Sequence, residues 1–140
     1  MTISNTLTKG AWATALAAAI LAGATTSASA NSAPYIGDGY PNNTHAVWCV
    51  QNSVNYAISH YAFGQYPAIA EDGVWGPRTK AAVQEFQYLF SANTTGVMVQ
   101  DGIVGRMTGE HLLQYGDPYY TGGPVQPSDA YCTRYLPNGF

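Results

Sequence analysis

The apolar positions of the chain recur at helical spacing in three stretches. The first stretch covers residues 45–61, where apolar side chains follow one another at intervals of mostly three and four: Val47, Val50, Val54, Ala57, Ile58 and Tyr61. Such intervals place side chains on one face of an α-helix. We therefore predict a helix over residues 45–61, with Thr44 as its N-cap.

Two further helices are predicted downstream. One follows Gly76 and Pro77, because proline suits the first helical position, where its missing N–H costs nothing. Its apolar face is formed by the following residues: Ala82, Val83, Phe86, Leu89 and Phe90. The other helix covers residues 107–115 and ends at Gly116, since glycine is a common helix stop.

Residues 72–83 and 101–112 repeat one pattern at a spacing of 29 residues. Each copy has Asp-Gly, an aliphatic residue, another apolar residue, Gly, two variable residues and Thr. An Asp carboxylate bonds nearby N–H groups and glycine accepts positive φ, so Asp-Gly predicts a tight turn. We predict a turn that starts a helix in each copy, with the aliphatic residue, Val74 or Ile103, pointing into the core. The predicted turn residues are Asp72, Gly73, Gly76, Asp101, Gly102 and Gly105.

The first 30 residues differ from the rest of the chain. A positive start at Lys9, an apolar run over 11–24 and a small-residue end at 28–30 predict a secretory signal peptide over residues 1–30. The apolar run is shorter than the roughly 20 residues that a membrane helix needs. We expect a secreted protein beginning at Asn31, without a membrane span.

Charge narrows the classes of partner. Lys9 is the only charged residue before residue 31, so residues 31–140 keep four basic and all eight acidic side chains, a net charge of −4. Nucleic-acid binding needs clustered Lys and Arg, and we therefore exclude it. All 11 tyrosines lie in this part of the chain, which favours contact with an uncharged partner by stacking and hydrogen bonding.

The two cysteines, Cys49 and Cys132, predict one disulfide, because an even count in an exported chain favours pairing. A zinc site is the alternative, but it requires further ligands at metal-like spacing, and neither CxxC nor HxxxH occurs. We expect no metal site and no cofactor. The predicted organisation is an irregular arm over 31–44, a helical domain over 45–116, and a tail over 117–140 that Cys132 ties down.

The repeat carries a family resemblance. Its first copy, Asp72–Thr79, is followed by Phe86-Gln87, and its second copy, Asp101–Gly105, is followed by Thr108. At these residues the chain resembles the peptidoglycan-binding-domain-like family, small three-helix modules of bacterial cell-wall hydrolases, over residues 45–116. The resemblance implies an all-α, three-helix orthogonal bundle that binds peptidoglycan through its glycan or its stem peptide.

Five candidate ligand-binding residues follow from the resemblance and from their chemistry. Trp75 would form a wall for a sugar ring or peptide, with a core role as the alternative. Arg78 and Arg106, in the variable pair of each copy, would meet a stem-peptide carboxylate through charge-assisted bonds, or remain solvated. Gln87 would bond either ligand or backbone. Tyr88 would belong to a stacking strip, or simply pack.

The function expected from these features is non-catalytic binding of cell-wall peptidoglycan by an extracellular or wall-associated monomer. We expect no catalytic residue, because no Gly-x-Ser-x-Gly or HExxH motif occurs and catalysis in the family resides in an attached domain. Two alternatives stay open at this point. One is an interaction module that partners a separate wall hydrolase, and the other is a small wall hydrolase.

Overall fold

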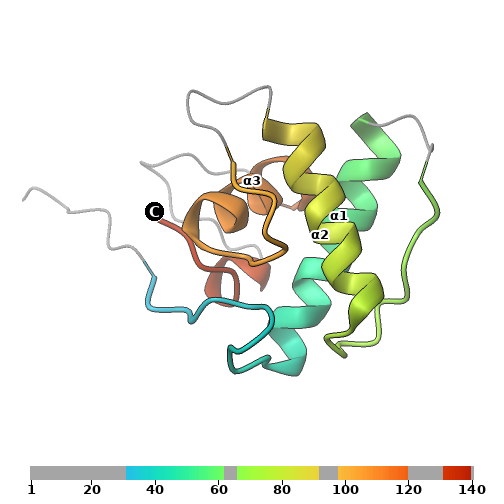
Figure 1. Ribbon diagram of the computed structural model, residues 1–140. Helices are drawn as coiled ribbons and strands as arrows, with labels where there is room; N and C mark the ends of the chain where they lie inside the picture. Colours follow the sequence, from blue (N-terminus) through green and yellow to red (C-terminus); the bar gives the residue numbers. More distant parts are fainter. Residues whose placement is uncertain (1–30, 62–65, 92–97, 120–130, 140) are drawn as a thin grey trace, which may run out of the picture.

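The computed structural model describes residues 31–61, 66–91, 98–119 and 131–139, and it is built from helices (Figure 1). The elements, in chain order, are α1 (Thr44–Tyr61), α2 (Pro77–Ser91), α3 (Arg106–Gly116) and the 3-10 helix η1 (Tyr131–Arg134). The described residues contain no strand, so the all-α class is confirmed. Each of the three predicted helices begins within one residue of its expected start. The predicted leader, residues 1–30, lies outside the described residues.

The start of α1 corrects one expectation. Thr44 is the first helical residue, and Asn43 caps the helix instead. The Asn43 side-chain oxygen accepts hydrogen bonds from the N–H groups of His45 (2.9 Å) and Ala46 (3.3 Å). Asparagine is a better cap than threonine. Thr44 packs against the first Asp-Gly turn instead, because its methyl group lies 2.6 Å from where a Cβ on Gly73 would be.

Helix α1 is central to the fold and packs against both α2 and α3. One apolar core fills the space between the helices, and its largest fully buried side chains include Phe86, Leu112 and Leu113. Fully buried members of the described core also come from outside the helices, among them Ile36 from the arm, Val104 from the segment before α3 and Leu136 from the tail. The N-terminal arm therefore contributes to the core although it forms no helix.

The arm and the tail are fixed by backbone and side-chain bonds. Ile36 exchanges two backbone hydrogen bonds with Val104 (3.2 and 2.8 Å), which form an isolated antiparallel bridge. Asn31 donates to the carbonyl oxygens of Thr133 (2.7 Å) and Leu136 (2.8 Å). These bonds join the two ends of the described chain, 102 and 105 residues apart in sequence.

The predicted disulfide between Cys49 and Cys132 is confirmed. It joins α1 to η1, and its two Cα atoms lie 5.5 Å apart. Beyond it, residues 135–139 pack on α3, where the backbone of Pro137 approaches Gly109. Gly116, at the end of the same helix, approaches the backbone of Ser53 in α1 in a similar way. Both glycines therefore serve close backbone packing.

Candidate functional site

A buried glutamine organises the turn of the first repeat copy. Gln51, on α1, is only 1 % exposed. Its amide nitrogen donates to Asp72 Oδ1 (2.9 Å), the Val74 carbonyl (3.2 Å) and Thr79 Oγ1 (3.2 Å). Its amide oxygen accepts from the N–H of Gly73 (2.8 Å), which has a φ of 70°. One side chain therefore connects α1, the Asp-Gly turn and the first turn of α2.

The second copy repeats these bonds with Gln87, on α2. Its amide nitrogen donates to Asp101 Oδ1 (3.1 Å), the Ile103 carbonyl (3.0 Å) and Thr108 Oγ1 (3.2 Å). Its amide oxygen accepts from Gly102, which has a φ of 73°. The repeated unit is therefore larger than the sequence pattern suggests, because each turn includes a glutamine from the preceding helix.

The second glycine of each copy has a different structural role from the first. The carbonyl oxygens of Gly76 and Gly105 accept the first helical bonds, from Lys80 (3.0 Å) and Gly109 (2.8 Å). Gly105 has a φ of −88°, so its conformation does not require glycine. A Cβ on Gly76 would meet no atom within 4 Å. These two residues are helix N-caps without a capping side chain.

The expected core role of the aliphatic residue is wrong for Val74, which is 63 % exposed. Its counterpart Ile103 is half-buried. The following residue points inward instead: Val104 is fully buried, and Trp75 packs against the core while its indole N–H donates to Asp38 (2.9 Å). Gln51 and Gln87 bond to the backbone carbonyls of Val74 and Ile103 and so fix the direction of this extended segment. Because successive side chains of an extended segment point in opposite directions, the residue after the aliphatic one faces the core.

Each copy also lines a groove, and the two grooves match position by position. The first-copy groove has a volume of about 430 Å³ and is lined by Gln51, Ile69, Ala70, Asp72, Val74, Gly76, Pro77, Arg78 and Thr79. The second-copy groove has a volume of about 310 Å³ and is lined by Gln87, Met98, Val99, Asp101, Ile103, Gly105, Arg106, Met107 and Thr108, together with Tyr35 and Tyr40. The two arginines occupy neighbouring positions of the repeat, since Arg78 aligns with Met107 and Arg106 with Pro77.

Tyr35 and Tyr40 distinguish the second-copy groove from the first. They come from the arm, are 42 % and 39 % exposed, and their ring centroids lie 5.7 Å apart. The bridge between Ile36 and Val104 holds this part of the arm against the second copy. Sequence reasoning missed both tyrosines, because an arm without periodicity gives no signal of where it docks.

The five predicted ligand-binding residues do not form one cluster. Gln87 and Arg106 line the second-copy groove, but Gln87 is 1 % exposed and its amide is used in internal bonds. Arg78 lines the first-copy groove. Trp75 is half-buried beside Asp38. Tyr88 is 60 % exposed on α2 and lines neither groove.

Two carboxylates near the turns are stabilised in their charged form. The Val74 N–H, followed by the Gln51 amide, holds the pKa of the Asp72 carboxyl below its usual value. Lys80, followed by the Trp75 indole, lowers the pKa of Asp38, and the Lys80 ammonium lies 2.6 Å from the Asp38 carboxylate. Asp38 is exposed, so this ion pair stabilises the fold only weakly.

No group of three or more His, Cys, Asp or Glu side chains among the described residues is placed to hold a metal ion. No helix in the described ranges is long and apolar enough to cross a membrane.

Comparison with known proteins agrees with the repeat. Residues 61–112 match the family model described as "Putative peptidoglycan binding domain". The match spans both Asp-Gly turns, all of α2 and the first part of α3. No curated protein and no solved structure matches the chain. This segment is therefore similar to the peptidoglycan-binding-domain-like family, and the similarity supports a role in cell-wall binding.

Proposed function

We propose that this protein is a non-catalytic, extracellular module that binds bacterial cell-wall peptidoglycan in the second-copy groove. The observation that carries the proposal is the family match over residues 61–112, which contains nine of the 11 residues that line this groove. The remaining two, Tyr35 and Tyr40, add an aromatic wall.

The chemistry of the second-copy groove suits a ligand with both apolar and polar faces. Tyr35 and Tyr40 offer half-exposed rings for stacking against a sugar ring or a peptide. Arg106 is exposed at the start of α3, where a guanidinium forms charge-assisted hydrogen bonds to a stem-peptide carboxylate. The base of the groove is rigid, because Gln87 bonds to both the turn and α3. Binding to an already ordered surface avoids part of the entropic cost of association.

The same lining argues for binding without hydrolysis. Glycoside hydrolysis requires two carboxyl groups on opposite sides of the scissile bond. Among the described residues that line the second-copy groove, Asp101 is the one carboxylate, and its Oδ1 accepts hydrogen bonds from Ile103 and Gln87. A single shallow groove gives modest affinity, and a repeating polymer raises the effective affinity through multivalency.

An extracellular or wall-associated location follows from the same ligand. The Cys49–Cys132 disulfide suits an oxidising compartment, and peptidoglycan lies outside the cytoplasm. The signal peptide proposed for residues 1–30 would deliver the protein there.

Co-sedimentation with purified cell-wall sacculi tests the proposal. We expect the folded, oxidised protein to pellet with sacculi. Arg106→Ala should weaken binding by about tenfold, the loss typical of one charge-assisted hydrogen bond. Arg78→Ala is the matched variant, because it removes an exposed arginine from the first-copy groove and should leave binding unchanged. Failure of the oxidised protein to pellet, or loss of binding only in Arg78→Ala, would contradict the proposal.

A further inference from the structure

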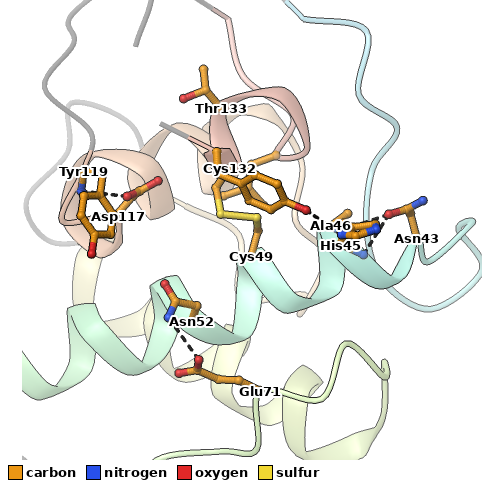
Figure 2. Close-up of a disulfide and its surroundings, with 12 residues drawn as sticks. Asn43, His45, Ala46, Cys49, Asn52, Glu71, Asp117, Tyr119, Cys132 and Thr133 are labelled. Carbon is orange, nitrogen blue, oxygen red and sulfur yellow. Dashed lines mark hydrogen bonds between the residues drawn. A yellow bond between two sulfur atoms is a disulfide. The ribbon is translucent and has the colours of Figure 1, made fainter. Parts of the chain in front are cut away.

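A third groove, larger than the two repeat grooves, lies beside the disulfide, and we call it the disulfide groove (Figure 2). Its volume is about 640 Å³, within the range of small-molecule sites. It is lined by His45, Trp48, Asn52, Tyr56, Asp117, Pro118, Tyr119, Tyr131 and Cys132. None of these residues belongs to the segment that matches the family or to the lining of the second-copy groove. The groove is therefore a separate feature of this chain, built from α1, from the segment that follows α3 and from η1.

Exposed aromatic rings form the walls of the disulfide groove. Trp48 is 36 % exposed and Tyr131 is 44 % exposed, and their rings meet edge to face at a centroid distance of 6.1 Å. The Tyr131 hydroxyl hydrogen-bonds to Nδ1 of His45 (2.6 Å), which holds the tyrosine in place. Tyr119, 79 % exposed, adds another ring. Large aromatic surfaces that are ordered yet open to solvent are suited to stacking against a ligand.

Two oxygen acceptors accompany these rings. Asp117 is only 9 % exposed, and its Oδ1 accepts the N–H of Tyr119 (2.9 Å), while its second oxygen has no hydrogen-bond partner among the described residues. Asn52 donates its amide hydrogen to Glu71 (3.1 Å). Figure 2 shows that the Asn52 carbonyl oxygen consequently points away from Glu71, toward the side of α1 that carries Cys49. A carboxylate oxygen that no described residue engages can accept a hydrogen bond from a ligand or from water.

We propose that the disulfide groove binds an uncharged pyranose ring of a glycan, which stacks on Trp48 and donates hydroxyl hydrogens to Asp117 and Asn52. The groove also contains a donor group, the indole N–H of Trp48. Sugar hydroxyls both donate and accept, so they match a lining that contains both kinds of group. The inference does not rest on the proposed function, since it concerns another surface and a soluble ligand.

An organic ammonium group is the competing ligand, because a carboxylate among aromatic rings also suits a cation. The position of Arg134 favours the neutral sugar. It lies three residues after Tyr131 in η1, and side chains at this spacing in a 3-10 helix are neighbours. Arg134 does not line the groove, but its positive charge acts on Tyr131 and opposes the entry of a cation on that side.

Fluorescence titration of the full, oxidised chain tests the inference. The probes are the tetramer of N-acetylglucosamine and wall glycan strands stripped of their peptides, with tetramethylammonium as the cationic probe. We expect saturable binding of at least one glycan. Asp117→Asn should weaken binding by about tenfold, because the amide keeps the bond from Tyr119 but loses the charged acceptor. Trp48→Ala should weaken it by at least about fivefold, and Trp48→Phe should restore much of the loss.

Variants and outcomes separate this site from the second-copy groove. Binding by Trp48 variants is followed by calorimetry, since they lose the fluorescent reporter. Tyr61→Ala, an exposed aromatic at the other end of α1, and Arg106→Ala should both bind the glycan as the parent does. Saturation by tetramethylammonium without either glycan would overturn the inference. The absence of glycan binding would also overturn it. So would binding of the glycan by Asp117→Asn and Trp48→Ala that is as tight as binding by the parent. Soluble glycan binding without sedimentation on sacculi would refute the proposed function and leave this inference standing.

Discussion

We predict that Gly109→Ala reverses the usual effect of alanine in a helix. Helix propensity alone predicts that alanine stabilises α3 by about 1 kcal/mol relative to glycine. In the structure, a Cβ on Gly109 would overlap the carbonyl oxygen of Pro137, with the carbonyl carbon at 3.0 Å and the nitrogen at 3.3 Å. Real Cβ atoms essentially never approach closer than 3.0 Å, so either α3 or the tail must shift.

The expected magnitude follows from how firmly the tail is held. The obstructing atoms are backbone, and the tail around Pro137 is anchored by the disulfide at Cys132 and by the bond from the Asn138 N–H to Asn31 (3.2 Å). Forcing an extra methyl group into such packing costs up to about 3 kcal/mol. Subtracting the propensity gain of about 1 kcal/mol leaves a destabilisation of about 2 kcal/mol. For a domain of this size, that lowers Tm by roughly 8–16 °C.

Urea and thermal unfolding of the oxidised protein measure the effect. Gln114→Gly, at an exposed position of the same helix, calibrates propensity and should cost about 1 kcal/mol. In a background without the disulfide the tail can move, so the penalty of Gly109→Ala should shrink. If Gly109→Ala is as stable as the parent or more stable, the described packing of the tail on α3 is wrong.

Three further predictions concern the disulfide, the buried glutamines and the turn carboxylates. Reduction of Cys49–Cys132, 83 residues apart, should cost about 4–5 kcal/mol of unfolding free energy, measured by urea titration with and without reductant. Gln87→Ala removes four hydrogen bonds and should cost about 3–4 kcal/mol, whereas Gln84→Ala, one turn earlier on α2, should change stability by no more than about 0.5 kcal/mol. The folded-state pKa of Asp72 is depressed, so its stabilising contribution is present above the unfolded value of 3.8 and is lost as the pH falls below it. The urea midpoint of Asp72→Asn should therefore fall less than that of the parent as the pH decreases below 3.8. An equal fall in both proteins would contradict the depressed pKa of Asp72.

Local signals account for what could be predicted from the sequence. The periodic apolar residues of α1 and α2, the proline at the start of α2 and the glycine at the end of α3 placed the helices to within one residue. The pairing of Cys49 and Cys132 was predictable because the chain offers no other cysteine. Each of these features depends on neighbouring residues or on simple counting.

What could not be predicted depends on contacts between distant segments. Gln51 and Gln87 sit at ordinary helical positions, and their role appears only when the turns 21 and 14 residues later fold back onto them. Tyr35 and Tyr40 reach the second-copy groove only because the arm pairs with Val104. Propensity counts Gly109 as a weakness of α3, whereas the structure uses it to admit the tail. Spacing along the chain contains none of this information.

Chemical-shift mapping of the oxidised protein with a defined muropeptide tests the central claim most directly, because it detects binding and locates the groove together. The account predicts saturable perturbations concentrated at residues 35–40 and 98–108, with Arg106 among the most affected. It is contradicted if saturating muropeptide leaves residues 98–108 unperturbed, whether the protein fails to bind or binds through another surface.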